Sequence, residues 1–159
     1  MSTLELPALY VDSVALVVTT PRLVLVNRDP SPGESGVPID ATIALELVDT
    51  GPDGVERSTA RVWIDGVLAF DGSALPEVAP AFAGPLASVT QTTDTLRVVL
   101  HPVAPLASLA TVHVRVLAQT VGGAASLDEV YSFVVEDRTA PRVVGAQALA
   151  QKTVRVAFD

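Results

Sequence analysis

The sequence predicts an all-β fold in which two antiparallel sheets pack against each other. Apolar residues make up 49% of the 159 residues, and Val, Ala and Leu dominate this fraction. Valine favours strands because its branched β-carbon is stiff and packs well on a pleated surface. Apolar and polar residues alternate over several short stretches, which are separated by many of the 12 Pro and 10 Gly. Short alternating segments joined by turns are typical of a β-sandwich.

Residues 1–20 form a leader ahead of the predicted domain. Within the leader, residues 10–18 favour one strand, for which the sequence shows no partner. This strand either joins the domain that follows or docks the protein onto a larger assembly, with Tyr10, Val14 and Leu16 as candidate contacts. The leader shows neither the basic region nor the long apolar run of a signal peptide. We therefore expect assembly in the cytoplasm, or export by an unusual route.

The predicted sandwich covers residues 21–137 and contains about seven strands. The clearest one is at 112–117, where valines alternate with His113, Arg115 and Leu117. Asp65-Gly66 predicts a tight hairpin, because a type I′ turn needs positive φ at both central residues. The expected strands are 23–26, 43–48, 60–64, 67–70, 96–100, 112–117 and 131–136.

Two long segments of the predicted domain show no strand periodicity. Residues 27–38 are rich in Pro and Gly, which predicts a reversal of the chain without regular structure. Residues 73–92 are rich in Ala and Pro, and we expect a long connection that carries at most one weak strand.

A short repeat predicts that a second unit begins near the end of the sequence. The segment 20–24 (Thr-Pro-Arg-Leu-Val) is echoed at 140–144 (Ala-Pro-Arg-Val-Val), after a polar hinge at 136–139. Alternation over 154–158 then indicates a further strand. We interpret residues 138–159 as a hinge and the first strands of a second β repeat. These strands are too few to bury a core, so either more protein follows or the tail pairs with something else.

Three segments resemble the bacterial immunoglobulin-like repeats that occur in surface proteins and phage tail proteins. Residues 30–43 are similar to the opening of these repeats, 58–66 to their hairpin ending in Asp-Gly, and 137–141 to the joint between repeats. In pattern, the resemblance covers residues 21–159. It implies an immunoglobulin-like sandwich that serves as a non-enzymatic spacer, adhesion or assembly domain, usually followed by another repeat.

Charge and composition argue against several classes of function. The formal net charge of −8 disfavours nucleic acid and anionic lipid as partners, because both bind basic surfaces. The sequence has no Cys, which excludes disulfides and thiolate metal sites and is more typical of bacterial and phage sandwiches than of animal ones. No stretch reaches the roughly 20 apolar residues that span a bilayer, so we expect no membrane insertion.

Residues that could carry chemistry are few. His101 and His113 are the only histidines, and no nucleophile elbow, phosphate-binding loop or zinc motif accompanies them. We therefore expect neither enzyme activity nor a cofactor. Glu136 and Asp137 at the hinge, together with Asp29, are weak candidates for a Ca²⁺ site, since Ca²⁺ prefers oxygen ligands. A solvated acidic hinge is the favoured interpretation of these carboxylates.

Trp63 is the main interface candidate, together with Arg61. If the apolar residues of strand 60–64 point inward, the indole of Trp63 lies outward beside Arg61. An outward indole is a common hot spot of protein interfaces. The alternative is that the connection 73–92 simply covers it.

Together these features predict a non-catalytic structural or assembly protein of a large complex. The favoured setting is a phage virion (tail, baseplate, fibre or capsid surface) assembled in the host cytoplasm, with the sandwich as a spacer or docking module. The expected partners are other structural proteins of the same assembly and copies of the chain itself. The alternative is a bacterial cell-surface adhesin or carbohydrate-binding module.

Overall fold

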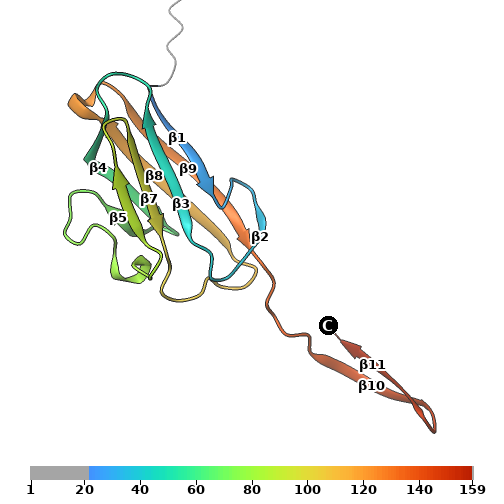
Figure 1. The fold of residues 1–159 in the computed structure, drawn as a ribbon. Helices are drawn as coiled ribbons and strands as arrows, with labels where there is room; N and C mark the ends of the chain where they lie inside the picture. Colours follow the sequence, from blue (N-terminus) through green and yellow to red (C-terminus); the bar gives the residue numbers. More distant parts are fainter. Residues whose placement is uncertain (1–21, 159) are drawn as a thin grey trace, which may run out of the picture.

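The computed structural model describes residues 22–158, and this part of the chain is almost entirely β. A four-stranded and a five-stranded sheet pack face to face, and a two-stranded hairpin lies near the C-terminus (Figure 1). The all-β sandwich predicted from the alternation of apolar residues is confirmed.

The first sheet has four strands, each antiparallel to its neighbours. They lie in the order β1 (Leu23–Asp29), β3 (Ile43–Asp49), β7 (Thr95–Leu100) and β6 (Ser88–Gln91). This order matches that of strands A, B, E and D in an immunoglobulin-like sandwich.

The second sheet has five strands, in which β9, β8, β4 and β5 take the places of strands G, F, C and C′. A short β2 pairs in parallel with the end of β9. The order is β2 (Ser35–Val37), β9 (Ser126–Val135), β8 (Thr111–Thr120), β4 (Val55–Ile64) and β5 (Val67–Asp71).

The helical segments of the described chain are two 3₁₀ turns, η1 (Pro80–Phe82) and η2 (Val121–Gly123). Within residues 22–158, no helix has the length and apolar character needed to cross a membrane.

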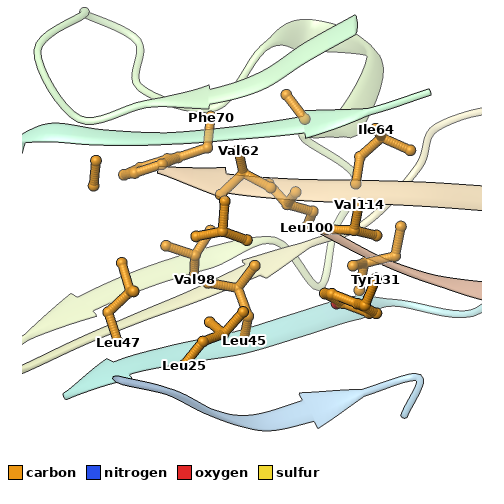
Figure 2. Close-up of a cluster of buried hydrophobic side chains, with 14 of the residues drawn as sticks. Leu25, Leu45, Leu47, Val62, Ile64, Phe70, Val98, Leu100, Val114 and Tyr131 are labelled. Atoms are coloured by element: carbon orange, nitrogen blue, oxygen red, sulfur yellow. The ribbon is translucent and has the colours of Figure 1, made fainter. Parts of the chain in front are cut away.

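Apolar side chains from both sheets meet between the layers. Leu45, Leu47 and Val98 of the four-stranded sheet point toward Val62 and Phe70 of the five-stranded sheet (Figure 2). All five side chains are at most 1% exposed. Burying one side chain of this size contributes about 1.5–3 kcal/mol to the free energy of unfolding. Contacts between the layers are therefore the main source of stability.

The hairpin between β4 and β5 forms as the sequence predicts. Asp65 and Gly66 have φ angles of 48° and 79°, as a type I′ turn requires. The Asp65 carboxylate also accepts a hydrogen bond from the backbone N–H of His113 on β8, at 2.8 Å. The turn is thus tied to the strand beside it.

A buried carboxylate organises the turn between β3 and β4. The side chain of Asp49 accepts backbone N–H bonds from Gly51 (3.0 Å) and Gly54 (2.8 Å). The bond from Gly51 is the largest cause of the lowered pKa of Asp49, and the nearby Arg22 guanidinium adds to it. Gly54 has a φ of 81°, and a Cβ there would lie 2.4 Å from the carbonyl oxygen of Thr93. This position therefore requires glycine.

The segment 27–38 is more regular than its Pro and Gly content predicts. β1 continues to Asp29, and residues 35–37 form β2, so the expectation of a loop without regular structure is wrong. β2 is only three residues long, and its partner β9 is distant in the sequence. Periodicity within the segment cannot reveal such a pairing.

The connection 73–92 carries one short strand, β6, as expected. Before β6, several contacts hold the connection against the five-stranded sheet. Val78 forms an isolated bridge with Phe70 of β5. Glu77 accepts two hydrogen bonds from the Arg57 guanidinium of β4, one of them at 2.6 Å to Nε. A bidentate pair of this kind fixes the position of the connection.

The C-terminal hairpin consists of β10 (Val143–Ala150) and β11 (Thr153–Phe158), paired antiparallel. β10 begins directly after Arg142, just as β1 begins directly after Arg22. All residues from 143 to 157 are exposed. The strand predicted over 154–158 is confirmed, while its assignment to a second β repeat stays a prediction.

Tyr131 on β9 carries the one buried side-chain oxygen of the described residues that has no hydrogen-bond partner. The residue is 6% exposed, and the Arg28 guanidinium lies 5.6 Å from the centre of its ring. Burial raises the pKa of Tyr131 to about 12. A buried hydroxyl without a partner costs about 1–3 kcal/mol of stability.

Replacing Tyr131 by Phe tests whether the buried hydroxyl costs stability. At neutral pH, Tyr131→Phe should leave the free energy of unfolding unchanged or raise it by about 1 kcal/mol, because the ring stays and the unpaired hydroxyl goes. In the wild type, the folded pKa lies above the unfolded value of about 10, so stability falls as the pH rises from 10 toward 12. In the variant, the part of this fall in stability that is due to Tyr131 should be absent. Chemical denaturation across this pH range measures the free energy of unfolding of both proteins. A loss of more than about 1 kcal/mol at pH 7 would mean that the hydroxyl has a stabilising partner.

Candidate interaction surface

Trp63 lies on the outer face of the five-stranded sheet. Its neighbours along β4 are buried in the core, so the alternation of the strand points the indole away from the core. Across the sheet, Trp63 pairs with Leu68 on β5 and with Arg115 on β8, and Arg115 pairs in turn with Val130 on β9. We refer to Leu68, Trp63, Arg115 and Val130 as the Trp63 row.

Arg115 lies over the indole of Trp63. Its guanidinium carbon is 5.4 Å from the centre of the ring, which is within the range of a cation–π contact. The same guanidinium donates two hydrogen bonds to the Asp128 carboxylate, at 2.8 and 2.7 Å. These bonds lower the pKa of Asp128 and raise the pKa of Arg115. Asp128 thus orients a charged group against the aromatic face.

The Trp63 row borders a shallow hollow with a volume of about 330 Å³. Two apolar residues of the row are well exposed, Leu68 at 39% and Val130 at 65%. Tryptophan and arginine, which lie together on this face, are enriched in protein interfaces. The residues that line the hollow are Trp63, Gly66, His113, Arg115 and Val130.

Arg61, the residue expected beside Trp63, has polar partners of its own. Its guanidinium forms an ion pair with Asp71 on β5 at 3.2 Å and donates to the Ser73 hydroxyl at 3.0 Å. The cation over the indole is Arg115 instead. The connection 73–92 contributes no residue to the lining of the hollow, so the idea that it covers Trp63 gains no support.

The two histidines lie in different places. His113 borders the hollow beside Trp63, whereas His101 at the end of β7 borders a hollow formed with Gly84 and Pro102. The Nδ1 atom of His101 accepts a hydrogen bond from the backbone N–H of Leu86, at 3.3 Å. Among residues 22–158, no three His, Asp or Glu side chains gather in a way that could hold a metal ion.

The acidic residues of the hinge have local partners. Glu136 accepts a hydrogen bond from Arg138 Nε at 2.8 Å, which is the largest cause of its lowered pKa. Asp137 accepts one from the backbone N–H of Thr139, also at 2.8 Å. Asp29, on the edge strand β1, does not join them in a cluster. The geometry thus favours a structural role for this hinge, and Ca²⁺ binding remains an untested prediction.

Sequence reasoning found Trp63 but not the residues that surround it. Alternation indicates that Arg115 points outward, but only the cross-strand register places it beside the indole. This register depends on pairing between segments that are far apart in the sequence. Asp128 and Val130 lie before the predicted strand 131–136, and the structure extends that strand back to Ser126. The other interface candidates, Tyr10, Val14 and Leu16, lie outside the described residues.

No protein-family model matches this chain, and a search of curated proteins finds no match either. The resemblance to bacterial immunoglobulin-like repeats stays a prediction, which rests on the three segments described in the sequence analysis.

The packing of Arg115 on Trp63 can be tested by fluorescence, because Trp63 is the only tryptophan. Arg115→Ala should move the emission to longer wavelength and increase quenching by acrylamide, since water then reaches the exposed ring face. The matched control is Arg97→Ala, which removes an exposed arginine from β7 in the other sheet. Equal quenching in the wild type and Arg115→Ala would show that the guanidinium does not cover the indole.

Proposed function

We propose that this protein is a non-catalytic spacer and docking module of a large protein assembly, most plausibly a phage virion. The observation that carries the proposal is the path of the chain through the sandwich. The chain comes into β1 at one end of the sandwich and leaves β9 at the opposite end (Figure 1). A domain with its two connections at opposite ends extends an assembly in one direction.

Hydrogen bonds identify the two ends. At the amino end, Thr50 N–H donates to the Arg22 carbonyl at 2.7 Å, and Val121 N–H donates to the Gly54 carbonyl at 3.0 Å. At the carboxyl end, Leu109 N–H donates to the Glu136 carbonyl at 3.2 Å. The ten-residue strand β8 between these ends is about 34 Å long at the usual rise per residue. Each sandwich would thus add a spacer of roughly this length.

The joint after β9 is restrained. A restrained joint suits a spacer better than a flexible one would. The hydroxyl of Ser108 accepts a hydrogen bond from the backbone N–H of Arg138 at 2.8 Å. It also lies within hydrogen-bonding distance of the Glu136 carbonyl and the Asp137 carboxylate. These contacts fix the direction in which the chain leaves the sandwich, as far as Thr139.

The virion setting draws on composition and pattern. A sandwich without cysteine fits bacterial and phage proteins. The immunoglobulin-like repeats that three of its segments resemble occur in phage tail proteins. The proposed partners are neighbouring structural proteins and further copies of the chain, which would be engaged through the Trp63 row and the exposed strand edges.

A cell-surface adhesin or carbohydrate-binding module is the second candidate, and one observation favours it. The hollow beside Trp63 offers an aromatic face next to His113 and Arg115, a combination that can stack on and hydrogen-bond to a sugar ring. However, the hollow contains a single aromatic side chain, which limits the stacking surface. The small stacking surface therefore favours the spacer over the carbohydrate-binding module.

Immunogold labelling of the producing bacterium and of its purified phage particles separates the two settings. Antibodies against the chain should label virions at one defined position, and heating that dissociates the particles should release the label. Intact uninfected cells should stay unlabelled. Label on the outer surface of such cells, with none on virions, would favour the adhesin and contradict the virion assignment.

A further inference from the structure

The C-terminal hairpin has one fully apolar face. Ala146 pairs with Val156 and Ala148 with Val154, and alternate pairs of an antiparallel ladder share one face. Val154 is 63% exposed and Val156 is 45% exposed. An isolated two-stranded hairpin is marginally stable in water, so this face is expected to pack against another surface.

The hairpin also differs in charge from the rest of the protein. The tail, residues 138–159, contains four basic residues and one acidic residue (Arg138, Arg142, Lys152, Arg155 and Asp159), whereas the chain as a whole has 18 acidic and 10 basic residues. Residues 22–137 contain 15 acidic and 6 basic residues. The sandwich is therefore strongly acidic and the tail is basic. Charge separation of this kind favours contact between the tail and a sandwich.

We infer that the hairpin of one copy docks onto the Trp63 row of a second copy, so that the chains associate head to tail. The row offers the hairpin an apolar counterpart, because Leu68 lies beside Trp63 and Val130 beside Arg115, and both expose aliphatic surface. The Asp65 carboxylate lies at its margin and can face Lys152 or Arg155 of the hairpin, whereas Asp128 is already paired with Arg115.

The hairpin's own sandwich is a poorer partner. The contacts of Ser108 hold the joint extended as far as Thr139, and the hairpin projects beyond the carboxyl end of the sandwich (Figure 1). Contact with a second copy is heterologous, because the tail surface of one chain meets the face of another. Such contacts leave one free tail and one free face at the two ends, so the assembly can grow.

Sedimentation velocity of the 159-residue chain tests this inference. At about 0.05 M salt, the average mass should rise with concentration beyond that of a dimer, and at about 0.5 M salt association should weaken. The emission of Trp63 should shift over the same concentration range, because the hairpin buries the indole. A chain that stays monomeric in both salts would overturn the inference.

Two variants distinguish head-to-tail contact from pairing of two hairpins. Val156→Asp damages the tail and Trp63→Asp damages the face, so each variant alone should be monomeric. Mixed together, they should form a dimer and no larger species, because each partner retains one intact surface. If Trp63→Asp still associates while Val156→Asp does not, the hairpins pair with each other and the inference fails.

Controls keep these outcomes interpretable. Val103→Asp alters a residue that is 65% exposed elsewhere on the sandwich and should associate as the wild type does. If Trp63→Asp does not fold, Val130→Asp replaces it, since Val130 belongs to the same row and is 65% exposed, as Val103 is. The inference deepens the proposed spacer function. A chain that labels virions but stays monomeric would refute head-to-tail docking alone.

Discussion

Packing between the two sheets is the interaction on which the rest of the structure depends. Leu45 and Leu47 of β3 meet Val62 and Phe70 of the opposite layer, and these side chains are almost completely removed from water (Figure 2). Without this contact, each sheet would expose an apolar face to water, which is unfavourable. Because each strand alternates, the same packing dictates which side chains point outward. Trp63 faces solvent as a consequence of its neighbours facing the core.

Local polar contacts then shape the ends of the sandwich. Asp49 closes the turn at the amino end through two backbone N–H bonds, and Ser108 holds the departing chain at the carboxyl end. Both use a small polar side chain to satisfy backbone groups that no strand can pair. The two side chains lie at opposite ends of the sandwich, where the chain enters and leaves it. The exposed outer face and the uncovered hairpin are the surfaces that remain for contact with other molecules.

Much of the sandwich could be predicted from alternation and turn chemistry. The valines of β8 and the Asp65-Gly66 turn indicate their structures locally, because side-chain period and positive φ are properties of neighbouring residues. β2 escaped prediction because it is short and depends on a distant partner. The contact of Arg115 with Trp63 was not predicted for a related reason, because cross-strand register brings together residues that are far apart in the sequence.

Native-state hydrogen exchange followed by NMR tests the central claim most directly. If the two layers stabilise each other, the amides of β3 and β7 should exchange with the same highest opening free energy as those of β4 and β8. Amides of β10 and β11 should exchange much faster at concentrations where the chain is monomeric. Two sheets with clearly different opening free energies, or a hairpin as protected as the sandwich, would contradict the account.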